Sequence, residues 1–283
     1  MNTTQDLIHF LRSTKRRLLH AFSRLPYLTL AIFPVFPRHL LLENYIYVRH
    51  NSLRIFRVLA LGRISSWRVR TFSCKEPETL EWIESFLPGE ILFDVGANIG
   101  LYSLYAAYRG STVYAFEPSA QNFAILNVNI SLNPFSSLVK AFPIACHESF
   151  CFSSINLSSM QWASALSSFD QPIDQYGEVY KPAFVQGSIG VPLDLFCNSL
   201  SLSPSHIKID VDGNELSVLR GAVKCLSSAT LKSLLVELNP NRTDYHECIV
   251  LLHSYGFLLE ATQGSNRSIG ANTPFNHIFK RHL

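Results

Sequence analysis

The stretch 91-ILFDVGANIG-100 decides the fold prediction, because it joins a strand-like apolar run, an acid and a small-residue turn within ten positions. Residues 91–95 are mostly apolar, and two glycines follow that lie four positions apart. A strand that leads through a glycine turn into a helix is typical of nucleotide-binding folds, in which ligands bind at the carboxyl ends of the strands. Several cofactors use this arrangement, so the neighbouring motifs must discriminate among them.

From residue 91 onward, apolar strand patterns alternate with helical ones. The expected strands are 91–95, 112–116, 137–143, 206–211 and 232–238, and the expected helices are 99–109, 119–131, 213–227 and 244–255. A helix at 76–87 precedes them, and 257–261 with 275–281 are expected to form a closing antiparallel pair. This alternation predicts an α/β protein with a doubly wound, mostly parallel sheet. Between about 146 and 193 the pattern lapses, so we expect an insertion of hairpin and loops that covers the substrate.

The composition is that of an ordinary globular protein, with 283 residues of which 47% are hydrophobic and 16% charged. That length suits one Rossmann-sized domain with an extension. The six cysteines form neither a CxxC pair nor a zinc-binding spacing, which favours a reduced, cytoplasmic protein.

The charge is distributed unevenly along the chain. Residues 1–75 carry 13 basic and two acidic residues, a net charge of +11, whereas the remainder carries 11 basic and 19 acidic residues, a net charge of −8. A basic arm of this kind indicates an anionic partner such as a membrane surface, a phosphorylated substrate or nucleic acid; a solvated helical face is the alternative. We therefore predict a basic N-terminal extension over 1–75 and a main domain over 76–283.

Within this extension, residues 5–24 have the spacing of an amphipathic basic helix. The apolar segment 25–36 is too short to span a bilayer and contains Pro34. It is expected either to anchor the protein peripherally at a membrane or to be buried against the main domain. Residues 44–73 alternate in hydrophobicity, which predicts short strands.

The turn after residue 95 favours one cofactor over another. A dinucleotide-binding fold would show G-x-G-x-x-G around the pyrophosphate, but here Asn98 stands where the second glycine is expected. Gly96 lets the backbone approach a ligand, and Gly100 lets the helix pack close to the strand. Asp94, before the first glycine, would repel a pyrophosphate but suits a cationic amino-acid group. The motif therefore favours S-adenosylmethionine over NAD.

A second acid, Glu117, ends the expected strand 112–116 and lies 21 residues after Gly96. An acid at the tip of the second strand meets a ribose diol in such folds. NAD-dependent enzymes share this acid, and it could instead serve the N-terminus of the following helix.

Three further acids lie in 207-IKIDVDGNELSVLRGA-222. Asp210 closes an apolar strand and is expected to point into the ligand crevice. Asp212 and Glu215 have the spacing of a capping box, so Asp212 is expected to cap the following helix. Glu215 either shares this role or faces the crevice.

Taken in order, the segments DVGANIGLYSL, AFEPSAQNFAILNVNISLN, VPLDLF, IKIDVDGNELSVLRGA and LLVELNP resemble the motifs of the FkbM family of S-adenosylmethionine-dependent methyltransferases. The resemblance covers about residues 76–283. It implies a class I methyltransferase (Rossmann-like) fold, whose seven-stranded sheet has an antiparallel last strand. It also implies O-methylation of a hydroxyl on a sugar, glycan, lipid-linked saccharide, polyketide or other small metabolite.

The resemblance also implies roles for individual residues. The cofactor loop corresponds to Asp94, Gly96, Ala97, Asn98 and Gly100, the ribose acid to Glu117, and the adenine wall to Ala145 and Cys146. His147 stands where the family often has an acid. Asp210 and Glu215 correspond to the signature acids, and Glu237 to the acid that ends the fifth strand.

Methyl transfer to a hydroxyl needs a base within hydrogen-bond reach of the acceptor. The candidates are Asp210, Glu215, Glu237 and His147, of which Asp210 or Glu215 is the first choice; His147 fits a packing role better. We predict no metal in the site.

Three other functions are alternatives to methyl transfer to a small acceptor. A nicotinamide oxidoreductase is disfavoured by the glycine spacing. A non-catalytic, membrane-associated protein with a relic cofactor site would explain the basic arm. A nucleic-acid methyltransferase would more often show an N/D-P-P-Y tetrapeptide where this chain has Asp210-Val211-Asp212-Gly213. A small-molecule or glycan acceptor is therefore the expected partner, nucleic acid is not expected, and the sequence indicates no oligomeric state.

Overall fold

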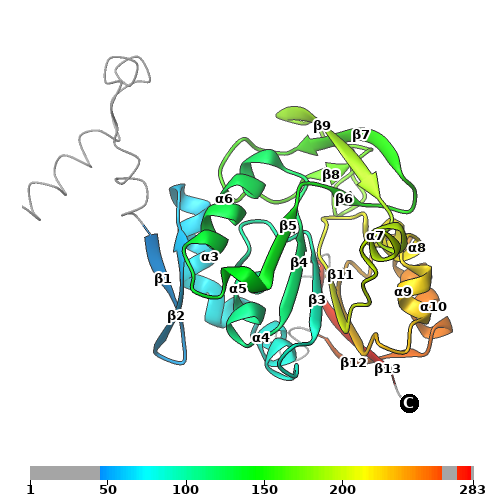
Figure 1. Ribbon diagram of the computed structural model, residues 1–283. Helices are drawn as coiled ribbons and strands as arrows, with labels where there is room; N and C mark the ends of the chain where they lie inside the picture. Colours follow the sequence, from blue (N-terminus) through cyan, green and yellow to red (C-terminus); the bar gives the residue numbers. More distant parts are fainter. Residues whose placement is uncertain (1–44, 263–272, 282–283) are drawn as a thin grey trace, which may run out of the picture. The chain divides into compact units, whose positions relative to one another are not determined.

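Seven strands form the central sheet of the computed structural model, which describes residues 45–262 and 273–281 (Figure 1). Their order is β12-β13-β11-β10-β3-β4-β5. They are β3 (Ile91–Val95), β4 (Thr112–Phe116), β5 (Val139–Phe142), β10 (His206–Ile209), β11 (Ser233–Leu238), β12 (Phe257–Thr262) and β13 (Phe275–Arg281). The strands from β11 to β5 pair in parallel, and β13 is antiparallel to both of its neighbours. This confirms the predicted doubly wound sheet with an antiparallel last strand.

Helices cover both faces of this sheet. One flank in Figure 1 carries α3 (Gly62–Lys75), α4 (Pro77–Glu84), α5 (Leu101–Tyr108) and α6 (Ala120–Ser131). The other carries α7 (Leu193–Leu200), α8 (Glu215–Arg220), α9 (Val223–Ser227) and α10 (Tyr245–Ser254). Successive side chains of a strand alternate between two hydrophobic clusters: Leu92 packs into the first, and its neighbour Phe93 into the second. Because side chains alternate across a strand, one sheet supports both cores and leaves its carboxyl edge open for a site.

The described chain begins with a hairpin of β1 (Tyr45–His50) and β2 (Leu53–Leu59). The prediction of short strands holds for this pair, but it is wrong for residues 62–75, which form helix α3. The buried residues of α3 are Ser65, Val69 and Phe72, four and three positions apart, as one face of a helix requires. The alternating run 67-WRVRTF-72 imitates a strand locally, and packing of this face decides the outcome.

Residues 45–75 contribute to the same hydrophobic core as the helices that follow. Phe72 contacts the ring of Phe56 at a centroid distance of 5.7 Å and that of Tyr105 at 5.6 Å. Helix α4 has Pro77 in its first turn, as predicted. The predicted basic helix 5–24 and apolar segment 25–36 lie outside the described residues. Within the described part, no helix is long and apolar enough to cross a membrane.

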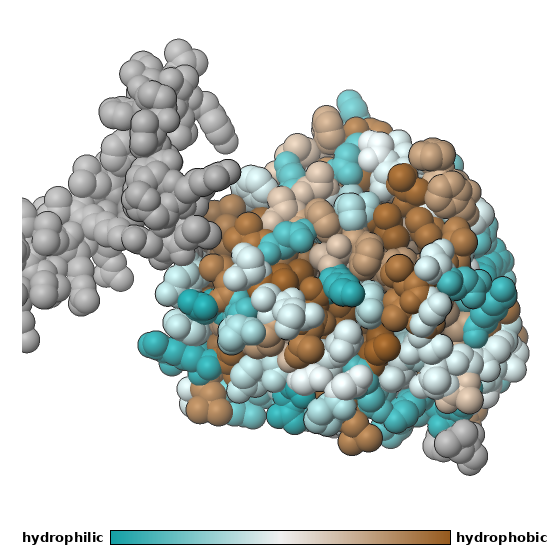
Figure 2. Space-filling model, in the orientation of Figure 1, coloured by the Kyte–Doolittle hydropathy of each residue, from teal (hydrophilic) through white to brown (hydrophobic). Residues whose placement is uncertain are grey.

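The insertion forms a small sheet of its own beyond the carboxyl ends of the central strands. Its strands are β6 (Ala145–Cys146), β7 (Cys151–Leu157), β8 (Ser168–Phe169) and β9 (Phe184–Val191), in the order β6-β9-β7-β8. Strand β7 pairs antiparallel with β8 and with β9, so the insertion contains antiparallel strands joined by long loops. Hydrophobic residues reach its surface (Figure 2), and Phe150 and Phe152 are among the exposed ones.

The helix expected over 213–227 is divided into α8 and α9. Asp194 explains the second start, because its carboxylate accepts hydrogen bonds from the backbone N–H groups of Lys224 (2.8 Å) and Cys225 (3.0 Å). Gly221 lies between the two helices, where a Cβ atom would come within 2.2 Å of the His147 carbonyl oxygen. The break therefore seats the insertion close to the helical layer.

The position of α3 in the core gives the first prediction. Replacing Phe72 by alanine should lower the free energy of unfolding by about 3–5 kcal/mol, because a buried aromatic ring leaves a cavity. The matched control is Phe152→Ala, whose ring is 79% exposed and should cost less than about 0.5 kcal/mol. Urea titration of both variants measures this, and equal losses would contradict the placement of α3 in the core.

Candidate active site

The candidate site is a cavity of about 360 Å³ at the carboxyl ends of β3, β4, β10 and β11. A smaller chamber of about 50 Å³ adjoins it between β3, α3 and α5. The larger cavity is lined by seven predicted site residues: Gly96, Asn98, Glu117, Ala145, Cys146, Asp210 and Glu237. Asp94 and Ala97 line only the chamber, and Gly100 and Glu215 line neither space.

The turn after β3 is fixed by the strand beside it. The backbone N–H groups of Gly96 and Ala97 both donate to the Phe116 carbonyl oxygen at 3.0 Å. Gly96 has a φ of +82°, and a Cβ atom there would lie 1.8 Å from the Asp210 carbonyl oxygen. Position 96 therefore requires glycine because its backbone packs closely against the loop after β10, whether or not a ligand also approaches it. A Cβ atom on Gly100 would lie 2.4 Å from Leu126, so this second glycine lets α5 approach α6 rather than the strand.

Glu117 connects the two loops that follow β3 and β4. Its Oε2 accepts a hydrogen bond from the Asn98 N–H at 2.8 Å, and its Oε1 accepts one from the Ser119 N–H at 2.9 Å. The second bond meets the start of α6, so Glu117 serves the helix as well as lining the cavity. Burial raises the pKa of Glu117 to about 7, against the opposing effect of these two hydrogen bonds. Each oxygen keeps a lone pair for a ligand donor.

Beneath these loops lies Lys208, a buried lysine of β10 that sequence reasoning missed. Its Nζ is 2.7 Å from Asp210 Oδ2 and 4.0 Å from Asp94 Oδ1. Burial acts to lower its pKa, but the charges of Asp210, Asp94 and Glu76 outweigh this and raise it. The available signal was a lysine flanked by Ile207 and Ile209 in the strand 206-HIKI-209.

The carboxylates of Asp94 and Asp210 differ in their surroundings. Asp94 is 1% exposed and accepts a hydrogen bond from Ser103 Oγ at 2.5 Å, while its Oδ1 has no hydrogen-bond partner among the described residues. Burial raises the pKa of Asp94 in spite of Lys208. The pKa of Asp210 shifts in the other direction. Burial acts to raise it, but the ion pair with Lys208 lowers it overall.

The predicted capping role of Asp212 is wrong. Its Oδ2 accepts hydrogen bonds from the backbone N–H groups of Leu166 (2.7 Å) and Ser167 (3.4 Å), which belong to the insertion. Asn214 is the residue at the N-cap position of α8. Asp212 therefore fastens the insertion to the β10 loop. Glu215 holds the loop before α8, since its Oε1 accepts from the N–H groups of Gly213 (3.0 Å) and Val211 (3.3 Å).

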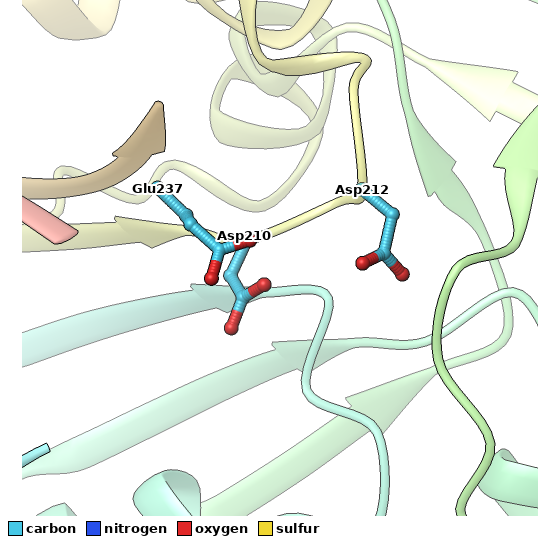
Figure 3. Close-up of side chains that lie close together, drawn as sticks. All are labelled: Asp210, Asp212 and Glu237. Atoms are coloured by element: carbon cyan, nitrogen blue, oxygen red, sulfur yellow. The ribbon is translucent and has the colours of Figure 1, made fainter. Parts of the chain in front are cut away.

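Glu237 lies near the carboxyl end of β11 and lines the cavity beside Asp210 and Asp212 (Figure 3). One oxygen from each of these three carboxylates lies within 4.8 Å of the others. Among the described residues, no group donates a hydrogen bond to the carboxylate of Glu237. Burial, followed by the charges of Asp210 and Asp212, raises the pKa of Glu237 well above its ordinary value. Glu237 therefore holds a proton more strongly than Asp210 does.

Three carboxylates so close together could hold a divalent cation. Two of them already have partners, because Asp210 is paired with Lys208 and Asp212 binds backbone N–H groups. The metal-free site predicted from the sequence stays a prediction.

The opposite wall of the cavity is apolar. Ala145 and Cys146 form β6 and line the cavity with Ile144 and Phe116. His147 lies outside this lining; its Nδ1 is 3.2 Å from the Ser149 carbonyl oxygen, and its ring contacts Phe169. The packing role expected for His147 agrees with these contacts.

Helix α3 supplies wall residues that sequence reasoning assigned to the basic arm. Trp67, Arg68 and Lys75 line the cavity. Arg68 and Lys75 are seven positions apart, which is two helical turns, so they share one face of α3. This spacing could have indicated the shared face, but an expected strand structure over 44–73 gave no reason to consider helical spacing.

The sheet order defines a Rossmann-like α/β fold, with the acid-lined cavity at its carboxyl edge as the candidate site. The family model described as "Methyltransferase FkbM domain" matches residues 94–259. The chain therefore belongs to the FkbM methyltransferase family, which confirms the resemblance seen in its motifs.

Individual relatives are more distant. The chain is 26% identical over 202 residues to the 31-O-demethyl-FK506 methyltransferase FkbM of Streptomyces tacrolimicus, covering 62% of this chain and 75% of that protein. It is 26% identical over 178 residues to the hexuronic acid methyltransferase AglP of Haloferax volcanii, covering 61% and 66%. A solved FkbM methyltransferase of Methylobacillus flagellatus matches with a TM-score of 0.47 and 16% identity, covering 78% of this chain. This chain spans 56% of that structure's length.

The buried carboxyl of Glu215 predicts a pH-dependent stability. Burial raises the pKa of Glu215 to about 7 in the folded protein, whereas an unfolded glutamate titrates near its ordinary value of 4.5. Unfolding therefore releases a proton between these values, and stability falls as the pH rises through about 7. Because both backbone hydrogen bonds end on one oxygen, Glu215→Gln can keep them and should recover up to ~3 kcal/mol at pH 8.

Urea unfolding of wild type and Glu215→Gln between pH 4.5 and 8.5 measures this effect. Glu117 and Asp212 have raised pKa values too, so the variant should keep part of the slope. Glu178→Gln, at an exposed acid, is the matched control and should follow the wild type. Parallel curves for wild type and Glu215→Gln would contradict the prediction.

Proposed function

We propose that the protein transfers the methyl group of S-adenosylmethionine to a hydroxyl of a sugar, glycan or other small-molecule acceptor. The observation that carries this proposal is Glu237, a carboxyl with a raised pKa that faces the same cavity as the cofactor loop. Methyltransferase activity follows from the family, whereas the cofactor, the acceptor and the residue roles are parts of the proposal.

Different parts of the cavity wall match different parts of S-adenosylmethionine. Ala145, Cys146 and Phe116 offer an apolar surface for the adenine ring. Glu117 has a free lone pair on each oxygen for the ribose hydroxyls. Further along, Asp210 and Glu237 give the cavity a negative potential that favours a sulfonium over a pyrophosphate.

The cofactor supplies an electrophilic methyl carbon on a sulfonium, so the protein has two remaining tasks. The first is to hold the acceptor oxygen in line with the methyl carbon and the sulfur, because orientation contributes much of such a rate enhancement. The second is to accept the hydroxyl proton while the new C–O bond forms and the C–S bond breaks. We assign this proton to a carboxylate oxygen of Glu237.

The alternative bases are less suited to this task. Asp210 is ion-paired with Lys208, and its lowered pKa makes it a weaker base. Glu215 lines neither the cavity nor the chamber and binds backbone N–H groups instead. Two nearby carboxyls with pKa values shifted in opposite directions are the usual arrangement for dividing acid–base roles.

The names of two relatives support a hydroxyl or sugar acceptor. One relative is named for a demethylated oxygen of FK506, and the other for hexuronic acid. The insertion, held by Asp212 over this end of the cavity, would then shape the acceptor-binding space.

Cofactor binding is the first test of the proposal. Calorimetric titration with S-adenosylhomocysteine should give a dissociation constant of micromolar order (about −8 kcal/mol), and NAD should not bind. Glu117→Ala should abolish this binding, because it removes the ribose acceptor. Glu81→Ala, at an exposed acid of α4, is the control and should bind as the wild type does. Binding that survives Glu117→Ala would rule out the ribose role.

Base catalysis is the second test. Glu237→Gln should slow methyl transfer by about 10²–10⁴-fold while changing S-adenosylhomocysteine affinity less than about threefold. Transfer of labelled methyl from S-adenosylmethionine to a panel of hexoses, hexuronic acids and their glycosides measures the rate. For the wild type, kcat/KM should rise with pH as Glu237 loses its proton, and Glu237→Gln should lack this limb. Persistence of the limb in the variant would assign the base elsewhere.

A further inference from the structure

The chamber next to the cavity combines both signs of charge in a small space. It is continuous with the cavity, since Gly96, Asn98 and Asp210 line both, as do Arg68 and Lys75 of α3. Its remaining charged lining consists of Asp94, Glu76 and Lys208. The residues of the apolar adenine wall line the cavity and not the chamber, so the chamber is a distinct space beside the cofactor loop.

The ammonium of Lys208 already has an ion-pair partner in this chamber. Its Nζ lies 2.7 Å from Asp210, and its side chain is 2% exposed. Lys75 donates to Glu76 at 2.6 Å. Arg68 differs from both, because the one hydrogen bond recorded for it within the described residues runs from Nε to the Ala163 carbonyl oxygen, at 3.0 Å. Its two terminal nitrogens remain as donors at the junction of cavity and chamber.

The chamber also contains a hydrogen-bond acceptor that has no donor among the described residues. Asp94 Oδ1 is buried without a hydrogen-bond partner among the described residues, and Lys208 Nζ is 4.0 Å away. A buried carboxylate oxygen without a donor is costly, which suggests that a ligand supplies one. An open pair of donors on Arg68 and an open acceptor on Asp94 match a zwitterion.

We infer that the chamber binds the amino-acid end of the cofactor, with the Arg68 guanidinium on its carboxylate and Asp94 Oδ1 facing its ammonium. This inference rests on the proposed function, and it adds α3 to the cofactor site although α3 precedes the matched family region 94–259. Arg68 thereby selects ligands that carry an α-carboxylate over those that end at the thioether.

The charge balance argues against Arg68 as a site for an anionic acceptor. Glu117, Asp210, Asp212 and Glu237 line the cavity, against Arg68 and Lys75. This excess of acids would repel an acceptor with a net negative charge. A ligand with a sulfonium, an ammonium and one carboxylate is a net cation, and only its carboxylate needs a guanidinium.

The test compares two ligands that differ only at the amino-acid end. S-Adenosylhomocysteine carries this end, and 5′-methylthioadenosine lacks it while keeping the adenosine and the thioether. Calorimetry on the full-length protein should show that Arg68→Ala weakens S-adenosylhomocysteine by about 10–100-fold, as expected for a lost charge-assisted hydrogen bond. Its affinity for 5′-methylthioadenosine should stay within about twofold, and Arg68→Lys should restore part of the loss.

Arg70→Ala is the matched control, because Arg70 is exposed on the same helix. Equal weakening of both ligands by Arg68→Ala would mean that Arg68 only holds α3 and the insertion in place, and would overturn the inference. Unchanged S-adenosylhomocysteine affinity together with slower methyl transfer would assign Arg68 to the acceptor and also overturn it. A wild type that binds neither ligand would remove the proposed function and this inference together, whereas tight binding insensitive to Arg68→Ala removes the inference alone.

Discussion

The buried ammonium of Lys208 is the interaction on which the site depends. It lies in the central strand β10 beneath the cofactor loop, paired with Asp210 and close to Asp94. Without this cation, the buried carboxylate of Asp94 and the partly buried carboxylate of Asp210 would lack a compensating charge, and an uncompensated buried ion costs several kcal/mol. With it, the pKa of Asp210 is lowered, whereas burial and the charge of Asp210 raise the pKa of the nearby Glu237, so the two acids of one cavity are shifted in opposite directions. The chemistry proposed for Glu237 follows from this division.

A second set of contacts ties the insertion to the same edge of the sheet. Arg242 donates to the carbonyl oxygens of Asp174 (2.8 Å) and Gly213 (3.0 Å), and Asp212 binds Leu166 and Ser167. These bonds join the insertion to the loops after β10 and β11. The loop that bears Asp210 therefore cannot move independently of the insertion, which couples the geometry around the base to the cover of the cavity.

The sequence predicts those features whose causes are local. The glycine turn, the acid after β4 and the alternation of strands and helices predict the doubly wound sheet and most of the cofactor wall, and the family resemblance adds its seven strands and antiparallel last strand. The expectation of short strands over 44–73 failed from residue 62 onward, because the alternating side chains there also fit a helix and Phe72 packs against residues from β2 and α5. The role of Asp212 failed for a related reason, since its hydrogen-bond partner Leu166 lies 46 positions earlier.

The same argument applies to the charges. A net charge of +11 over residues 1–75 indicated an anionic partner outside the protein, but a count of charges cannot say which of them face inward. Arg68 and Lys75 turn toward a cavity rich in acids, whereas Arg63 and Arg70 on the same helix are exposed. Arg68 and Lys75 thus offset part of the negative charge of the ligand site. Their two charges do not count toward a basic surface that could bind membranes or nucleic acid. Helix α3 accordingly belongs to the energetics of the site, and the case for an external anionic partner depends on the other basic residues of 1–75, among which Arg63 and Arg70 are exposed.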